Sequence, residues 1–374
     1  MEKSKKTVSV AVKITLTVCL IAFVVKGGSF SEGLLAELAL MSAKSYLPVW
    51  NFVRLSEQET TIATQVHKAE ETTAVQKLTA AVTVKKSING IDSDIKDIIK
   101  MAERQSSDDK KDGEIYEYTF TDDGVTDSFG NVRVKNTNRT QIDISERLSE
   151  ELALRLEENA PQILIYHTHT TETYQLLDRN FYAEGFLSRS NDENLNMVRV
   201  GKAVKQELEA MGYKVIHDTT VYDKKYSGAY ERSMEAASAC LERYPSIKIT
   251  LDIHRDAIQN DYGVKTKPTA VIGGKKAAQI MIIAGCQEEG NGITDLPEWE
   301  KNLTFALKLQ QSMEELFPGL TRPVFFCARS YNMGLTPWSL LVEMGTDANT
   351  LDEAVYSGKM LGRALGEMLR REAA

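Results

Sequence analysis

The chain has 374 residues, of which 42% are hydrophobic and 26% charged, a composition that is ordinary for a globular protein and excludes wholesale disorder. The formal net charge is −8 at pH 7 and no stripe rich in lysine and arginine appears, so we expect no nucleic-acid partner. The four cysteines are widely spaced and form no CxxC pair. That spacing excludes a cysteine-rich zinc knuckle and gives no sign of a disulfide framework.

The N-terminus predicts a membrane anchor. Residues 2–6 hold three lysines, and residues 7–25 are almost uninterrupted apolar sequence in which Lys13 is the only charge. Such a segment can cross the hydrocarbon core of a bilayer, which takes roughly 20 residues, and lysines before it favour a cytoplasmic N-terminus. We therefore expect residues 1–28 to be a cytoplasmic tip and a single transmembrane span, with the rest outside the cytoplasm. A cleaved signal peptide is the alternative, but no small-x-small cleavage site follows the apolar segment.

The next segment predicts a stalk. Residues 60–84 are rich in Thr, Ala, Gln and Glu, and residues 108–112 form a charged run. Such sequences cannot bury enough apolar surface to order themselves well. We therefore assign residues 29–113 to an extracytoplasmic stalk or linker, and residues 114–374 to a catalytic domain.

The remainder predicts an α/β fold. After an initial pair of short strands, segments typical of buried strands alternate with segments typical of amphipathic helices. This alternation indicates a mostly parallel central sheet flanked by helices. The expected strands are residues 163–166, 213–216, 247–253, 279–284, 324–327 and 340–342, and the expected helices are residues 196–211, 226–243, 299–316 and 351–371.

Polar side chains with catalytic potential follow the predicted strands. Ligand sites in open α/β sheets form beyond the carboxyl ends of the strands. Four of the five histidines and one glutamate are expected there: His167, His169, His217, His254 and Glu343. Strand propensity does not explain this clustering, whereas a metal site does.

The spacing fits a zinc hydrolase. A catalytic zinc ion takes three nitrogen or oxygen ligands from the protein and leaves a position for water. His169 and Glu172 form an HxxE pair, and His254 arrives from a later strand. Glu343 is then the expected base, since zinc lowers the pKa of water to about 7 and a nearby carboxylate can carry its proton.

Several assignments stay open at this level. His167 is an alternate metal ligand to His169, and either Asp192 or Glu193 is an alternate to Glu172. His217 is a further ligand or a hydrogen-bond donor to the transition state. Asp252 and Asp256 are candidates to orient a ligating imidazole, and Arg329 and Asn332 are candidates to contact substrate.

Four strings, taken in this order, resemble the stage II sporulation protein P family of endospore-forming Firmicutes. They are ILIYHTHTTE at residues 163–172, VIHD at 215–218, DIHRD at 252–256 and LVEMG at 341–345. The resemblance extends from about residue 114 to the C-terminus, and the single N-terminal span also fits.

The resemblance implies a peptidoglycan hydrolase with the fold of zinc N-acetylmuramoyl-L-alanine amidases. It implies removal of stem peptides from glycan strands, an additional crosslink endopeptidase activity, and work with the stage II sporulation D and M proteins at the mother-cell membrane during forespore engulfment. It also implies that His169 and His254 bind the metal and that Glu343 is catalytic. The sequence departs from the general amidase pattern, in which the carboxylate ligand comes near the next helix, and this keeps Glu172 against Asp192 or Glu193 open.

Two other functions remain in view. A zinc carboxypeptidase or endopeptidase of wall peptides uses a similar set of ligands and would need an arginine, Arg255 or Arg329, to hold a terminal carboxylate. A non-catalytic scaffold that binds the cell wall is the third reading. The full set of histidines and glutamates speaks against the scaffold.

Overall fold

The computed structural model describes residues 92–106 and 108–373. The predicted transmembrane anchor, residues 1–28, lies outside the described residues, as does most of the predicted stalk. Within the described part of the chain, no helix is both long enough and apolar enough to cross a membrane.

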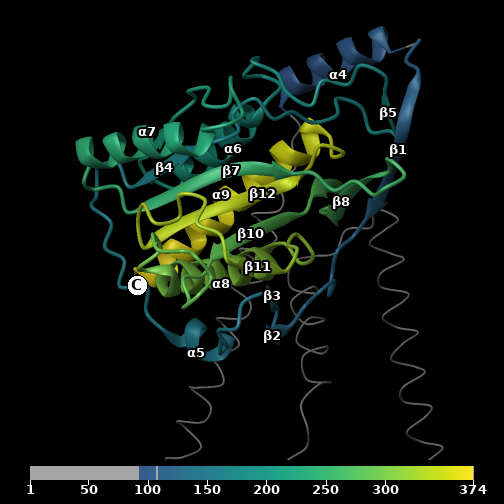
Figure 1. The fold of residues 1–374 in the computed structure, drawn as a ribbon. Coiled ribbons are helices and arrows are strands. Elements are labelled where there is room, and N and C mark those ends of the chain that lie inside the picture. The colour runs from purple at the N-terminus through teal and green to yellow at the C-terminus, as the bar shows by residue number, and fades with distance from the viewer. Residues whose placement is uncertain (1–91, 107, 374) are drawn as a thin grey trace, which may run out of the picture. The chain divides into compact units, whose positions relative to one another are not determined.

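The described residues form a mixed α/β fold around an eight-stranded sheet (Figure 1). Its central strands carry the candidate site, and a helix layer lies against it. In spatial order the strands are β2 (Asp127–Phe129), β3 (Val132–Asn136), β11 (Val324–Cys327), β10 (Ile280–Gly285), β12 (Trp338–Thr346), β7 (Ile249–Asp256), β4 (Ile163–Tyr166) and β6 (Val215–His217).

The sheet is mixed, which corrects the prediction of a mostly parallel sheet. Strand β10 runs antiparallel to β12, and β2 runs antiparallel to β3, whereas the other neighbouring pairs are parallel. The reason lies in the connections. A parallel neighbour needs a crossover of a dozen or more residues, usually a helix. The chain instead reaches β10 from β7 through two further strands without a helix, so nothing forces β10 to be parallel.

Those two further strands belong to a second, four-stranded sheet. Its order is β5 (Phe181–Ala183), β1 (Lys111–Tyr118), β8 (Lys265–Ile272) and β9 (Lys275–Ala278). Strands β8 and β9 were not predicted, because lysines and Pro268 interrupt the apolar alternation that marks a strand.

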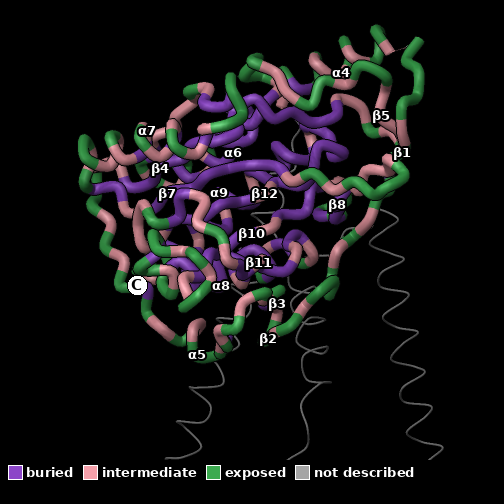
Figure 2. The backbone as a smooth tube through the Cα atoms, in the orientation of Figure 1, coloured by how far each residue is buried: buried purple, intermediate pink, exposed green. Residues whose placement is uncertain are grey.

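Helices cover both faces of the eight-stranded sheet near β4. Ile163 and Ile165 of β4 pack in the main core with α6 (Met197–Ala210), α8 (Trp299–Leu316) and α9 (Leu351–Glu372). Leu164 and Tyr166 pack on the opposite side against α7 (Ala229–Arg243). Because both faces are covered, all four residues of this strand are buried, as the purple interior of Figure 2 shows.

Two central strands are longer than predicted. Strand β7 continues through Asp256 and β12 continues through Thr346, so His254 and Glu343 lie within strands and not after them. In the sequence, polar residues at these positions are typical of a loop, so the strands were predicted to end before them. Each faces the site at the carboxyl end of the sheet while the backbone ladder continues.

Two short helices complete the described chain, α5 (Ile144–Ser149) and α4 (Ser93–Gln105). Helix α4 falls inside the segment assigned to the stalk. Its Ile95 is nevertheless fully buried, and Arg199 of α6 pairs with Asp92 and Asp94 at its start. The structured domain therefore includes residues that precede residue 114.

Candidate functional site

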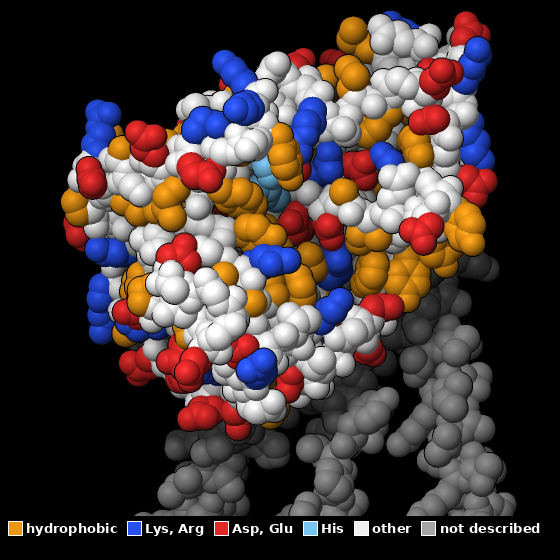
Figure 3. All heavy atoms as spheres, viewed as in Figure 1, with side chains coloured by type: hydrophobic (Ala, Val, Ile, Leu, Met, Phe, Trp, Pro, Cys, Tyr) orange, Lys and Arg blue, Asp and Glu red, His pale blue; other side chains and the backbone are white. Residues whose placement is uncertain are grey.

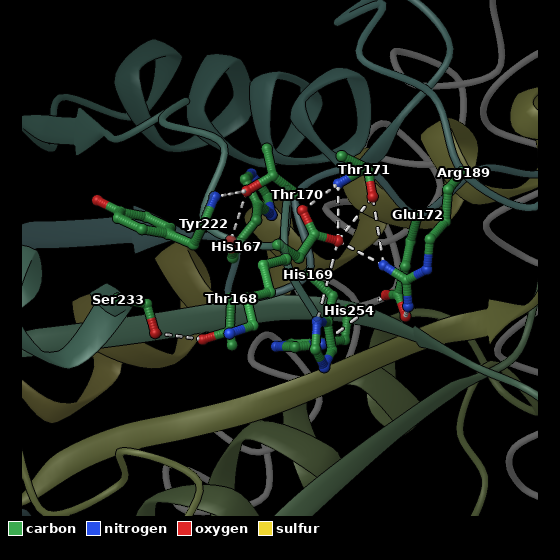
Figure 4. Close-up of polar contacts among 12 residues, drawn as sticks. His167, Thr168, His169, Thr170, Thr171, Glu172, Arg189, Tyr222, Ser233 and His254 are labelled. Carbon is green, nitrogen blue, oxygen red and sulfur yellow. Dashed lines mark hydrogen bonds and ion pairs between the residues drawn. The ribbon is translucent and has the colours of Figure 1, made fainter. Parts of the chain in front are cut away.

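Three neighbouring strands, β4, β7 and β12, bring the predicted residues together at the carboxyl end of the sheet. Glu343 of β12 lies directly opposite His254 of β7 in parallel register. Strand β4, on the other side of β7, ends at Tyr166 and leads into a buried turn that carries His169 and Glu172. Figure 4 shows His169, Glu172 and His254 pointing toward one another.

The contacts within this group are close. The rings of His169 and His254 lie with centroids 5.3 Å apart and nearly perpendicular. Nδ1 of His254 is 3.8 Å from Oε2 of Glu172. Nε2 of His254 is 2.7 Å from Oδ1 of Asp252, yet it makes no aligned hydrogen bond, so the contact is an ion pair of poor hydrogen-bond geometry. His254 therefore has one carboxylate at each ring nitrogen.

Burial and charge set the protonation of the group. Burial raises the pKa of Glu343 to about 8 and also raises the pKa of Glu172. Burial lowers the pKa of His169 to about 4. Burial opposes the charge on His254, but Asp252 and Glu172 outweigh it and raise the pKa of His254 to about 9. Three carboxyl groups, those of Asp252, Glu172 and Glu343, thus surround one buried imidazole, an arrangement that favours a cation.

Nδ1 of His169 and Oε2 of Glu343 are buried without a hydrogen-bond partner, and Nε2 of His254 has only its poorly aligned contact with Asp252. Buried polar atoms in proteins are normally paired. Histidine nitrogen and carboxylate oxygen are also the donors that zinc prefers. The donor set and its unpartnered atoms therefore fit a metal ion, although in the described residues no group of three His, Cys, Asp or Glu side chains is arranged as a formed metal site.

Asp252 holds the loop that carries His169. Its two carboxylate oxygens accept hydrogen bonds from the backbone N–H and the hydroxyl of Thr168, at 2.9 and 2.7 Å. The same carboxylate contacts His254. Asp252 therefore links the two histidines that the sequence predicts as ligands.

The other two predicted histidines pair with each other. Nε2 of His167 lies 2.8 Å from Nε2 of His217, and Nδ1 of His167 lies 2.8 Å from the carbonyl oxygen of Ile253. Burial lowers the pKa of both imidazoles, to about 4 for His167 and about 2 for His217. Both nitrogens of His167 are therefore committed to contacts other than His169 and Glu172.

The structure places the alternate carboxylates away from this group. Asp192 and Glu193 are exposed, and Asp192 accepts hydrogen bonds from Asn194 in its own turn. Asp256 pairs with Arg322, with 2.9 Å between Oδ2 and Nη1. Of the five carboxylates that the sequence offered as ligands or orienting groups, Glu172 and Asp252 are the ones in contact with His254.

The two predicted substrate contacts differ in exposure. Arg329 is exposed. Asn332 is buried, and its Nδ2 donates to the carbonyl oxygen of Tyr230 at 3.1 Å and to Oγ of Ser233 at 3.0 Å. Asn332 thus ties the loop before β12 to helix α7.

Asp223 and Arg189 were not predicted from the sequence. The Asp223 carboxylate is fully buried, with Oδ2 3.9 Å from Nδ1 of His169, and it accepts the hydroxyl hydrogen bond of Thr171. Arg189 bridges Asp223 and Glu172. Both residues lie in irregular segments far from any strand end, where no spacing in the sequence marks them.

An aromatic wall was missed as well. Tyr226 stacks on His169 with centroids 4.8 Å apart and is 67% exposed. Tyr230 meets the edge of His169 and stacks on Tyr331, with centroids 5.2 Å apart. Aromatic residues at helical spacing usually indicate core packing, so the sequence did not mark Tyr226 and Tyr230 as neighbours of the candidate site.

Comparison with known proteins identifies the family of this chain. The family model described as "Stage II sporulation protein P (SpoIIP)" matches residues 50–366, which is most of the chain. The chain belongs to the stage II sporulation protein P family. A member of this family from Bacillus subtilis (strain 168), named stage II sporulation protein P, is 28% identical over 218 residues. That match covers 55% of this chain and 50% of the relative, so it spans about half the length of the relative.

Solved structures of several amidases also match this stage II sporulation protein P family member. The CwlD amidase of Clostridioides difficile, solved in complex with the GerS lipoprotein, is 12% identical with a TM-score of 0.35, covering 57% of this chain and 98% of its own. The N-acetylmuramoyl-L-alanine amidase AmiC2 of Nostoc punctiforme is 12% identical with a TM-score of 0.33, covering 56% of this chain and 96% of its own. At these TM-scores the likeness does not establish a common fold.

Proposed function

We propose that this chain is a zinc-dependent peptidoglycan hydrolase that cleaves the amide bond between N-acetylmuramic acid and the L-alanine of the stem peptide. Membership of the stage II sporulation protein P family supports a role in sporulation. The observation that carries the proposed chemistry is the parallel register that sets Glu343 beside His254, with His169 and Glu172 facing the same point.

His169, Glu172 and His254 would hold the ion. The distance of 3.8 Å between Nδ1 of His254 and Oε2 of Glu172 is compatible with two ligands of one zinc ion, since each bond would be ~2.0–2.2 Å long. Bound there, zinc would polarise the scissile carbonyl and acidify water. Asp252, at Nε2 of His254, would fix the orientation of that imidazole.

Glu343 would move the proton. Its Oε2 has no hydrogen-bond partner, and it lies opposite His254 in the register of β12 and β7. In this role the carboxylate takes a proton from the attacking water and returns it to the leaving amine of L-alanine. The amide C–N bond breaks, the water oxygen stays on the muramic acid carboxyl, and the stem peptide leaves with a free amine.

The carboxypeptidase reading has less support. Arg255 was one of two candidates to hold a terminal carboxylate. Its Nε donates to the carbonyl oxygen of Thr173, and its Nη2 donates to that of Ser188, both at 2.8 Å. A guanidinium committed to backbone carbonyls in this way is a structural group. The other candidate, Arg329, is exposed.

The wider setting is also part of the proposal. Residues 1–28 would anchor the chain in the membrane, with the domain outside the cytoplasm. By the family resemblance it would act in engulfment with the stage II sporulation D and M proteins. Crosslink endopeptidase activity would accompany the amidase activity.

Digestion of purified sacculi by the full chain tests the chemistry. The proposal expects free stem peptides with an L-alanine amino terminus, and a large loss of release when Glu343 is replaced by Gln. Release of single amino acids would instead indicate a carboxypeptidase. Equal release by the wild type and Glu343→Gln would show that Glu343 is not the base.

A further inference from the structure

A row of aromatic side chains lies on one face of β1 and the residues that follow it. Tyr116, Tyr118 and Phe120 alternate along extended backbone, so their side chains share a face. The rings of Tyr116 and Tyr118 are stacked, with centroids 6.1 Å apart. The ring of Phe120 meets that of Tyr118 edge-on at 4.9 Å. Tyr116 is 59% exposed, and we call these three side chains the aromatic row.

The aromatic row connects to the candidate site. The guanidinium of Arg322 lies 4.8 Å from the centroid of Phe120, and its Nη1 lies 2.9 Å from Oδ2 of Asp256. Asp256 follows His254 by two residues on the same strand, so both project from one face of β7. In Figure 3, acidic and then basic side chains separate the histidine in the hollow of the surface from a hydrophobic patch at the right.

The end of the aromatic row at Phe120, its inner end, is held rigidly by hydrogen bonds. The buried side chain of Gln279 accepts a hydrogen bond from the backbone N–H of Phe120 at 2.7 Å and donates one to its carbonyl oxygen at 2.8 Å. The hydroxyl of Tyr118 donates to Asp123 at 2.8 Å. Rings that are fixed before binding lose little conformational entropy when a ligand packs on them.

The charges around the aromatic row favour a neutral ligand. The cation that contacts it, Arg322, is already paired with Asp256. Asp122 and Asp123 lie exposed just beyond its inner end. Carboxylates there repel the acidic groups of a stem peptide. The rings of a glycan strand are uncharged and present C–H faces that pack on aromatic rings.

We propose that the aromatic row binds the glycan strand that carries the scissile amide bond. This inference rests on the proposed amidase function and names where one side of that substrate lies. Tyr116 would contact a sugar remote from the cleaved bond, and Phe120 with Arg322 would lie nearest to it. Binding energy from remote sugars would then hold a long strand at the site more tightly than a single disaccharide.

The first experiment measures hydrolysis by the full chain with the double substitution Tyr116→Ala and Tyr118→Ala. Phe129→Ala is the matched control, since Phe129 is 51% exposed but lies on β2, outside the aromatic row. On intact sacculi we expect KM to rise roughly five- to tenfold with kcat unchanged. On a single disaccharide–peptide we expect both constants to match the wild type, as they should for Phe129→Ala on either substrate.

An unchanged KM on sacculi would overturn the inference, and so would an equal loss on both substrates. An unchanged KM on sacculi would also be expected if the aromatic row binds a protein partner instead. A second experiment separates this inference from the proposed activity: co-sedimentation of the full chain with sacculi in the Glu343→Gln background. Weaker sedimentation of the double variant supports the glycan site even if the wild type releases no stem peptide. Equal sedimentation contradicts the glycan site whatever the activity.

Discussion

Glu343 and His254 face each other across two parallel strands, β12 and β7. This register fixes the separation of the expected base and an expected ligand through backbone hydrogen bonds, and not through flexible loops. A base set in this way should be separable from metal binding. Glu343→Gln should therefore lower the rate of stem-peptide release by roughly 10²–10⁴-fold while zinc content stays unchanged. Glu289→Gln, at an exposed glutamate, is the control.

The proposed zinc ligands make a second prediction. The full chain should bind about one zinc ion, and His169→Ala and His254→Ala should each abolish stoichiometric binding, as measured by metal analysis after dialysis. Asp192→Ala removes an exposed carboxylate between β5 and α6 and should keep the metal. Full zinc in both histidine variants would refute the ligand assignment.

Asp252 gives a third prediction. Its carboxylate lies 2.7 Å from Nε2 of His254 and also accepts two hydrogen bonds from Thr168. An amide cannot stabilise the imidazole in the same way, so Asp252→Asn should weaken zinc binding by about 10–100-fold. Competition with a chelator of known affinity measures this. Affinity equal to the wild type would show that Asp252 serves the loop alone.

Gly201 on α6 makes a fourth prediction, about packing. A Cβ atom there would lie 2.6 Å from Cε1 and Nε2 of His167 and 2.7 Å from Nε2 of His217. His167 is fully buried and both rings are hydrogen-bonded, so they cannot easily move aside. Gly201→Ala should therefore lower the free energy of unfolding by about 1–3 kcal/mol. This loss outweighs the ~1 kcal/mol by which alanine is a better helix former than glycine.

Gly366→Ala on α9 is the matched control for that measurement. Its Cβ would meet Sδ and Cε of Met211 at 2.5 and 2.7 Å, and a methionine side chain can rotate away. Urea unfolding should show a clear loss for Gly201→Ala and little change for Gly366→Ala. Equal midpoints for the two variants would mean that the histidine pair is loosely packed.

Much of the scaffold could be predicted because local patterns determined it. The helix at residues 299–316 and the strands at 163–166 and 324–327 match the structure at both ends. The errors occur where tertiary contacts override local pattern. Strand β7 continues through three polar residues because the ladder with β12 satisfies its backbone.

The site shows the same division. The strings that carry His169, Glu172, His254 and Glu343 could be read from the sequence. The choice between His167 and His169 could not, because the strand stops at Tyr166 and the chain turns, which sends the two imidazoles to different partners. Asp223 was invisible for a similar reason, since only folding brings it to His169.

Helix α4 is attached differently from the rest of the domain. Ile95 is its one fully buried side chain, Ile99 packs partly buried against the core, and Arg199 and Lys359 form charged pairs with the residues at its start. Ion pairs weaken as salt rises, whereas apolar burial does not. This helix should accordingly be the first element to exchange its amide hydrogens at high ionic strength, detaching locally while the sheet that carries the candidate site keeps its protection.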